Sequence, residues 1–222
     1  MTLLCTYITG YGTEFVYPEL PREVVRNLAV EALPSGLIAF ELRDGAIAYW
    51  LNLILHHTFI RASSVSLPSI PALSSRLFAI QHSHARCCSL LRLAHREQLI
   101  ILNQPDAEPN QWRFISPATI SWLDASSQLH LKSSSERDLV SWLLRALDAI
   151  VEPSPLRAKQ ILLLAEEGSR LFQVLHQTHP LFGDFRTQPR DRIHAHLALV
   201  LATQRMLSQL LHQLSASAPK EL

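Results

Sequence analysis

Residues 76–99 read RLFAIQHSHARCCSLLRLAHREQL, and this stretch decides the fold class because apolar side chains recur in it every three or four positions. On a helix the apolar face would carry Leu77, Ile80, His84, Cys87, Cys88 and Leu91. The opposite face would carry His82, Arg86, Ser89, Arg92 and Arg96. The stretch therefore predicts an amphipathic helix whose apolar face belongs to a helical core.

Helical spacing continues through most of the sequence after this stretch. It predicts further helices at about 136–151, 155–178 and 189–214, and Ser154 suits the N-cap of the second of these. The last helix has the apolar stripe Ile193, Leu197, Val200, Leu201, Leu207, Leu210, Leu211 and Leu214. A polar connection with room for a short hairpin fills 103–134. Four helices with short turns predict an antiparallel helix bundle over 76–222.

The first 61 residues have a different pattern, which predicts a small α+β domain. A helix is expected from Pro21 to about Leu33, a strand over 37–42, and a second helix from Asp44 toward Phe59. Residues 62–75 are rich in serine and proline and are expected to be a linker. The fold class expected is therefore mainly α, with a small N-terminal α+β domain.

Known catalytic and cofactor motifs are absent from the sequence. The 6 glycines form neither a dinucleotide fingerprint nor a P-loop, which excludes a nucleotide cofactor of either kind. His84 and Cys88 lie four apart on one helix face, but Cys87 points away and no second cysteine pair exists, so no metal site is expected. Glu166 and Glu167 are neighbours and cannot converge on one substrate atom. We expect no catalytic residue, no metal, no cofactor and no enzymatic activity.

The charge of the chain is nearly balanced, at +1, but its basic residues are mostly arginine. Only three of the 20 basic residues are lysine, which leaves 17 arginines. Arginine binds phosphate with a planar fork and stacks on bases; coding bias explains the same excess equally well. Residues 1–75 sum to −2 and residues 76–222 to +3.

Three cysteines, two of them adjacent, do not make a disulfide framework. The first residues lack the features of a signal peptide, and the longest apolar stretch, Ala46–Ile54, is too short for a membrane span. We expect a soluble, cytoplasmic protein without membrane contact.

Three segments of the predicted bundle resemble the anticodon-binding (DALR) domain of arginyl-tRNA synthetases. The helix over 76–99 is similar to the family's Y-V-Q-Y-A-H-A-R-I-x-S-I-x-R, with matches at Gln81, His84, Ala85, Arg86, Ser89 and Arg92. Leu164-Ala165-Glu166, followed by Arg170 and Phe172, resembles L-A-x-x-F-N-x-F-Y. Leu197-Ala198-Leu199-Val200, followed by Arg205, resembles the closing helix. The resemblance implies a DALR-like domain over 76–222.

Residues 34–42 (PSGLIAFEL) resemble the G-P-G-F-I-N-F-x-L that closes the N-terminal tRNA-binding domain of the same enzymes. In those enzymes a catalytic domain lies between the two parts, whereas only 16 residues separate Phe59 from Arg76 here. Motifs of the HxGH and KMSKS kind are absent too. The resemblance thus implies a stand-alone protein that lacks the domain for arginyl-tRNA aminoacylation.

The sequence departs from the family at several places. Gly168-Ser169 replaces the family's F-N pair, Phe172 replaces a tyrosine, and His196 replaces an arginine. A phenylalanine keeps the stacking face of the tyrosine but loses its hydroxyl.

The resemblance leads to the prediction of a non-catalytic tRNA-binding accessory protein, with arginine tRNA among its candidate ligands. The residues expected to contact RNA are Arg86, Arg92, Arg96, Arg170, Phe172 and Arg205. The alternative is an adaptor that binds a protein partner through the bundle and has lost RNA binding; low charge and a net charge near zero favour that alternative.

Overall fold

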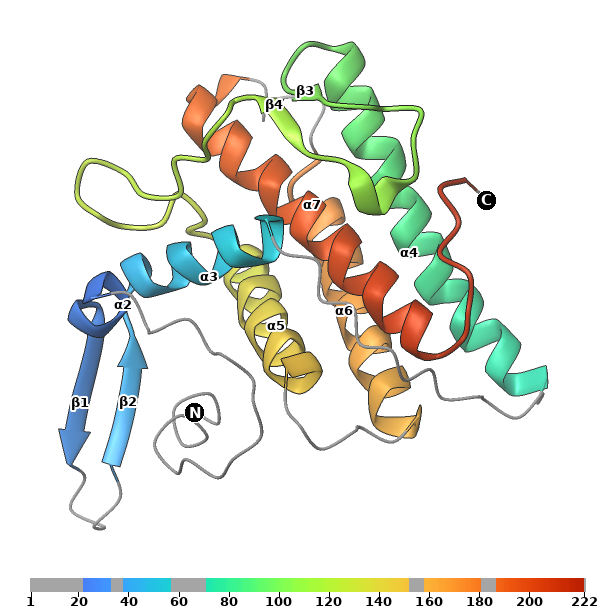
Figure 1. The fold of residues 1–222 in the computed structure, drawn as a ribbon, viewed down its shortest axis with the longest axis horizontal. Coiled ribbons are helices and arrows are strands. Elements are labelled where there is room, and N and C mark those ends of the chain that lie inside the picture. The colour runs from blue at the N-terminus through green and yellow to red at the C-terminus, as the bar shows by residue number, and fades with distance from the viewer. Residues whose placement is uncertain (1–21, 33–37, 57–70, 152–157, 181–186, 222) are drawn as a thin grey trace.

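The computed structural model describes residues 22–32, 38–56, 71–151, 158–180 and 187–221, and everything below refers to these residues. Four long helices form the bundle: α4 (Pro71–Arg96), α5 (Ser134–Val151), α6 (Ala158–Thr178) and α7 (Arg190–Gln213). Figure 1 shows α3 (Asp44–His56) crossing one side of them, with a two-stranded ribbon projecting beyond it. The expected class, mainly α with a small α+β part, is confirmed.

Helix α7 lies at the centre of the bundle. It packs against α4, α6, α3 and α5. The predicted apolar stripe is fully buried, yet burial extends around the helix, because Ala195, Leu199, Thr203 and Gln204 are buried as well. A helix enclosed in this way must find partners inside the protein for its polar side chains.

Two of these polar side chains are bound by the long helices around α7. His196 Nδ1 lies 3.1 Å from a carboxylate oxygen of Glu136 in α5. Gln204 Nε2 donates to His84 Nε2 of α4 at 2.8 Å. These contacts fix the position of α7 against both helices.

Arg205 connects α7 to α3 and to the long connection. Its guanidinium donates to the carbonyl oxygens of Ile54 and Leu55 at the end of α3 and, at 2.6 Å, to that of Trp112. Burial lowers the pKa of Arg205 to about 10, with a further contribution from the nearby charge of Arg113, so the side chain is still charged at neutral pH. A guanidinium bound to three backbone carbonyls is a structural clamp. In this conformation Arg205 contacts groups within the protein, and the expected contact with RNA stays a prediction.

The N-terminal part differs from the prediction in one element. Helix α2 (Arg22–Arg26) ends after five residues, and β1 (Leu28–Ala32) occupies the stretch expected to continue the helix. Strand β1 pairs antiparallel with β2 (Ile38–Leu42), the predicted strand, in the register Leu28↔Leu42 to Ala32↔Ile38. Pairing with β2 satisfies the backbone of β1, which outweighs its helical spacing.

Several boundaries can now be compared with the prediction. Helix α4 begins at Pro71, so the expected linker over 62–75 is wrong at its end; residues 62–70 lie outside the described part. The expected cap of α6 at Ser154 also lies outside it. The predicted hairpin is present as β3 (Ile101–Leu102) and β4 (Phe114–Ser116), with the 3-10 turn η1 (Pro109–Gln111) between them. No described helix is long and apolar enough to cross a membrane.

The start of α5 is held by a reciprocal capping box. Ser133 Oγ accepts a hydrogen bond from the Glu136 backbone N–H at 3.2 Å, and Glu136 Oε2 accepts one from the Ser133 N–H at 3.0 Å. Ser133 is thus the N-terminal cap of α5. The other oxygen of Glu136 binds His196, so one carboxylate serves both the cap and the core.

Gly168 lies in the middle of α6, where a glycine weakens a helix. It is present because the indole of Trp142 in α5 lies directly against it: a Cβ at this position would be 2.0 Å from Trp142 Cζ2. The indole is fully buried, and its Nε1 donates to the Leu164 carbonyl at 2.8 Å. The close packing of α5 on α6 therefore requires glycine here.

We predict that Gly168→Ala destabilises the protein although alanine favours helices. The gain in helix propensity is about 1 kcal/mol, whereas overpacking against a fixed indole costs about 1–3 kcal/mol or more. Chemical denaturation should show a lower free energy of unfolding. In a Trp142→Leu background the same substitution should cost less, and an equal cost in both backgrounds would contradict the explanation.

Glu136 makes the stability of the protein depend on acidic pH. Burial raises its pKa, but hydrogen bonds from His196 and Ser133 outweigh burial and lower the pKa from 4.5 to about 2. A lowered pKa in the folded state means that the stabilisation is complete above pH 4.5 and is lost as the pH falls toward 2.

We therefore predict a decrease in the free energy of unfolding between pH 4.5 and 2 that Glu136→Gln reduces. The contribution of this group should be up to about 3 kcal/mol, at about 1.4 kcal/mol per pKa unit. Urea unfolding at a series of pH values measures it. An identical pH profile for wild type and Glu136→Gln would show that other groups cause acid unfolding.

Candidate nucleic-acid interface

Helices α4 and α6 run parallel and keep a fixed register. Arg76 binds Glu166, Gln173 donates to Ser83, and Arg86 donates to His176, each pair being 90 residues apart in sequence. A constant offset means that the two helices advance together and share one outer surface. We call this surface the α4–α6 face; its exposed side chains are Phe78, Ala79, His82, Arg86, Arg170 and Gln173.

Buried hydroxyl groups hold the two helices together beneath this face. Ser83 Oγ and Ser169 Oγ lie 2.6 Å apart, and Ser169 donates onward to the Ala79 carbonyl at 3.2 Å. Gln173 Nε2 completes the chain by donating to Ser83 Oγ at 3.2 Å. The contact between α4 and α6 thus depends on small polar groups and leaves Arg86 and Arg170 at the surface.

Arg86 is held by a histidine and not by a carboxylate. Its Nε and Nη2 donate to His176 Nε2 at 3.3 and 3.1 Å. Burial lowers the pKa of His176, and the charges of Arg86 and His196 lower it further, so His176 is neutral at pH 7 and can accept these bonds. The ring of Phe172 stacks on His176, with centroids 6.2 Å apart. The positive charge of Arg86 is therefore held in position and has no carboxylate partner among the described residues.

The opposite flank of α4 binds residues 215–221, which follow α7 and which we call the C-terminal segment. Gln81 Nε2 donates to the Ser217 carbonyl at 2.9 Å, His84 Nδ1 to that of Pro219 at 2.8 Å, and Arg92 Nη2 to that of Lys220 at 3.2 Å. Three of the residues that match the synthetase helix therefore hold this segment.

His84 occupies a fully enclosed position between α4, α7 and the C-terminal segment. It donates from Nδ1 to Pro219 and accepts from Gln204 at Nε2, which is the arrangement of a neutral ring. Burial lowers its pKa, and the hydrogen bond to Pro219 only partly opposes this. His84 is a structural residue of the core.

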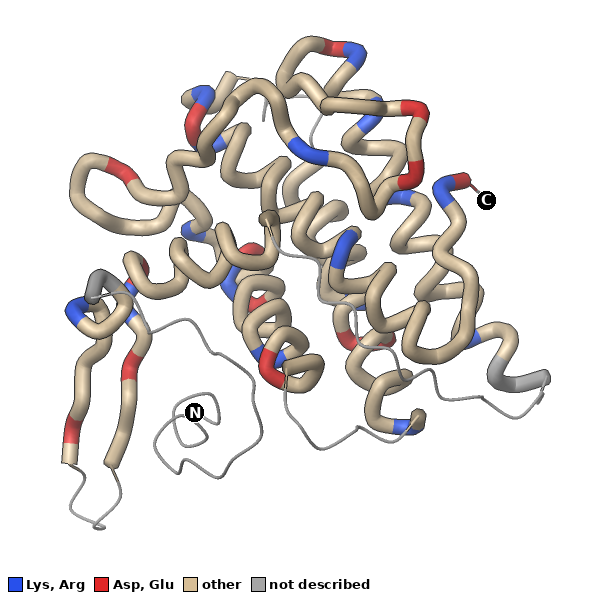
Figure 2. The backbone as a smooth tube through the Cα atoms, in the orientation of Figure 1, with Lys and Arg blue, Asp and Glu red and all other residues tan. Residues whose placement is uncertain are grey.

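The predicted RNA-contacting residues fall into two groups. Arg86, Arg96 and Arg170 are exposed, whereas Arg92 is 25% exposed and forms an ion pair with Glu221 at 2.5 Å. Arg86 and Arg92 leave α4 in different directions, one toward α6 and the other toward the C-terminal segment. The structure therefore does not unite all the arginines in one contact surface. Figure 2 likewise shows Lys and Arg interspersed with Asp and Glu.

Phe172 does not have the position expected of a stacking residue. It is 1% exposed and lies in the core beneath His176. A base cannot reach its ring in this conformation, and contact of Phe172 with RNA stays a prediction. The aromatic groups available on the α4–α6 face are Phe78, which is 56% exposed, and His82, whose ring centroid lies 6.5 Å from that of Phe78.

Sequence reasoning did not find His176 as the partner of Arg86, or Gln81 as a residue that binds the C-terminal segment. His176 could have been found, since it follows Phe172 by one helical turn and so lies on the same side of α6. The contact of Gln81 with Ser217 joins positions 136 residues apart and has no local signal.

Metal binding and thiol chemistry find no support among the described residues. No group of three or more His, Cys, Asp or Glu side chains there could hold a metal ion. Burial raises the pKa of the Cys87 thiol well above its usual value and that of Cys88 to about 12. Both thiols are therefore protonated and unreactive at neutral pH.

The chain is similar to a curated protein that acts on tRNA. It is 31% identical to the arginine–tRNA ligase of Gloeobacter violaceus (strain ATCC 29082 / PCC 7421) over 137 residues, which are 60% of this chain and 20% of that protein. No family model matches the chain, and no solved structure matches it. The chain is thus related to arginyl-tRNA synthetase over part of its length. The assignment to the DALR domain stays a prediction.

We predict that removing the C-terminal segment by ending the chain at Leu214 lowers the free energy of unfolding by about 1–2 kcal/mol. The segment forms several hydrogen bonds with α4, each contributing about 0.5–1.5 kcal/mol. After truncation, water forms hydrogen bonds with the groups left on α4 and offsets part of this loss. Hydrogen exchange should accelerate in α4 around Gln81 and His84. Glu221→Gln, which removes only an exposed ion pair, should change stability by less than about 1 kcal/mol. Unchanged exchange in the truncated chain would contradict the role of the segment.

Proposed function

We propose that this protein is a non-catalytic tRNA-binding accessory protein that contacts RNA through the α4–α6 face. The relation to arginine–tRNA ligase supports tRNA as the partner. The observation that carries the proposal is the position of Arg86: its guanidinium is fixed by a neutral histidine and lies at the surface, with no carboxylate partner in the described part of the chain. A pre-oriented guanidinium of this kind suits a phosphate oxygen.

Other groups on the same face fit an RNA ligand. Arg170 is exposed on α6, three residues before Gln173, which donates a hydrogen bond to Ser83 of α4. Phe78 and His82 offer exposed rings of the type on which unpaired bases stack. Charge for the backbone and rings for bases together suit a single-stranded loop better than a duplex, whose bases are already stacked.

We further propose that the protein does not aminoacylate tRNA. The sequence lacks motifs of the HxGH and KMSKS kind, and the similarity covers 20% of the ligase. A role in delivering, protecting or presenting tRNA to another enzyme fits a protein that binds without reacting.

A protein partner is the second candidate, because one stripe of α6 is apolar and exposed. Leu163 is 50% exposed and Val174 is 37% exposed, and their spacing along α6 places them on the same side as Arg170. An arginine between apolar side chains is a composition found at binding hot spots. The adaptor alternative would use this stripe.

We predict that binding of total tRNA weakens steeply with salt and that Arg86→Gln with Arg170→Gln reduces this dependence. Each lost phosphate contact should lower the slope of log affinity against log salt by about 1. Filter binding between 50 and 200 mM salt measures the slope. Equal binding and equal slopes for wild type and the double variant would refute the proposed surface.

A matched control removes two charges elsewhere. Arg26 and Lys159 are exposed on α2 and at the start of α6, so Arg26→Gln with Lys159→Gln should leave the slope nearly unchanged. Pull-down from native lysate with and without ribonuclease separates the two candidates, since a partner that persists after ribonuclease and is lost in Leu163→Ser would favour the adaptor.

A further inference from the structure

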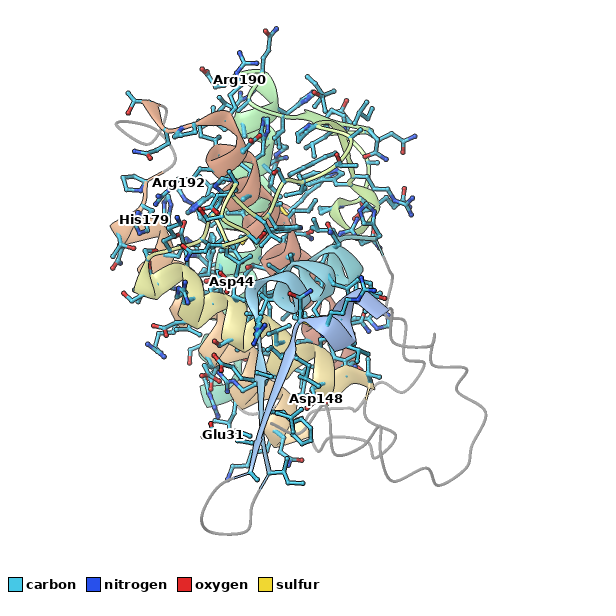
Figure 3. The ribbon with its side chains drawn as sticks, turned by 90° about the vertical axis from the view of Figure 1, so that its left-hand side faces the viewer. Glu31, Asp44, Asp148, His179, Arg190 and Arg192 are labelled. Atoms are coloured by element: carbon cyan, nitrogen blue, oxygen red, sulfur yellow. The ribbon has the colours of Figure 1, made fainter. Side chains whose placement is uncertain are left out.

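A second basic surface lies where α6 ends and α7 begins. Arg190 and Arg192 are in the first turn of α7, and His179 follows the last residue of α6; Figure 3 shows all three labelled on one part of the molecule. The ring of His179 lies 6.2 Å from that of His196, which is one turn beyond Arg192 on α7. We call these three residues the α7-start cluster.

The charges of this cluster are not compensated by the described residues. Neither arginine forms an ion pair with them. Asp191 leaves the helix about 100° away from each arginine, and the two arginines leave it about 160° apart, so that they lie on either side of the start of α7. Glu136 lies beneath the cluster, but His196 and Ser133 already use its carboxylate. The Nε atom of Arg192 is buried and has no hydrogen-bond acceptor among the described groups. The guanidinium groups of Arg190 and Arg192 therefore have no carboxylate partner in the described part of the chain.

The position of the arginines in the helix supports the same view. The first turn of a helix carries a partial positive charge, so cations there are unfavourable and carboxylates are favoured. Two arginines in the first turn of a 24-residue helix therefore weaken its start. Residues that oppose stability in this way are typical of binding sites.

The cluster is continuous with the α4–α6 face. His176, which holds Arg86, lies in the last turn of α6, and His179 follows one turn later. At the same end of the bundle His194 Nε2 donates to the Leu99 carbonyl at 3.1 Å, which brings the start of α7 beside the end of α4 and its exposed Arg96. An anionic chain that lies on Arg86 can thus extend across the end of α6 to Arg192 and Arg190.

We propose that the α7-start cluster binds the sugar–phosphate backbone of the RNA held by the α4–α6 face, as a second contact that extends the binding site over the end of the bundle. This inference rests on the proposed RNA binding. It assigns Arg190, Arg192 and His179 a role that neither the sequence pattern nor the similarity to the ligase gives them.

The test compares the salt dependence of tRNA binding in wild type and in Arg190→Gln with Arg192→Gln. Glutamine keeps the stem of each side chain and removes the charge. The slope should fall by about 1 for each arginine, and adding Arg86→Gln with Arg170→Gln should lower it further by the same amount as in wild type. Thermal unfolding of the α7-start variant should occur at the wild-type temperature or above it, because the charges oppose the helix dipole.

The outcomes separate this inference from the proposed function. Salt-dependent binding with a slope that Arg190→Gln and Arg192→Gln do not change would overturn the second contact and leave the α4–α6 face intact. Wild type without salt-dependent binding would overturn both. The control Arg26→Gln with Lys159→Gln removes the same charge. If it lowers the slope as much as the α7-start variant does, the effect comes from net charge alone and the second contact is overturned. If the double variant does not fold, the salt dependence of tRNA binding is measured for Arg190→Gln alone, since Arg190 is exposed.

Discussion

The structure depends on the enclosure of α7, because a helix buried on nearly every side cannot leave its polar groups to water. Each of three polar side chains finds its partner in a different element: His196 in α5, Gln204 in α4, and Arg205 at the end of α3. An apolar helix could slide or rotate within the bundle at little cost. These directional contacts allow only one position, and the clamp of Arg205 also fixes how the N-terminal part meets the bundle.

The sequence predicts where most helices lie, but it does not predict the contacts that hold the helices together. Periodicity located α4, α5 and α7, since an apolar face shows itself within a few turns. It failed over Leu28–Ala32, where the same spacing fits a helix and a strand, and only pairing with β2 decides between them. In the sequence the glycine at 168 is only a departure from a family pattern, whereas its structural reason, the indole of Trp142, lies on another helix.

The candidate site shows the same limit. Exposure of Arg86, Arg96 and Arg170 follows from their place on helices, so it could be predicted. The fates of Arg92 and Phe172 could not be, because one depends on Glu221, 129 residues away, and the other on how closely α6 packs into the core. A residue that matches a binding motif can also serve the fold, and only its neighbours in space show which role it has.

Net charge is a poor measure of local surface charge because it sums over groups that neutralise one another within the fold. Glu166 pairs with an arginine of α4, Glu167 with an arginine of α5, and Glu221 with a second arginine of α4. The carboxylate of Glu136 forms hydrogen bonds with the helix cap and with His196. Pairing therefore neutralises carboxylates as well as arginines. Among the arginines that have no carboxylate partner in the described part of the chain, Arg86 beside His176 and the pair that begins α7 lie toward one end of the bundle. A chain of charge +1 can in this way present a local positive surface, and its field is effective over the Debye length of about 8–10 Å and not over the whole molecule.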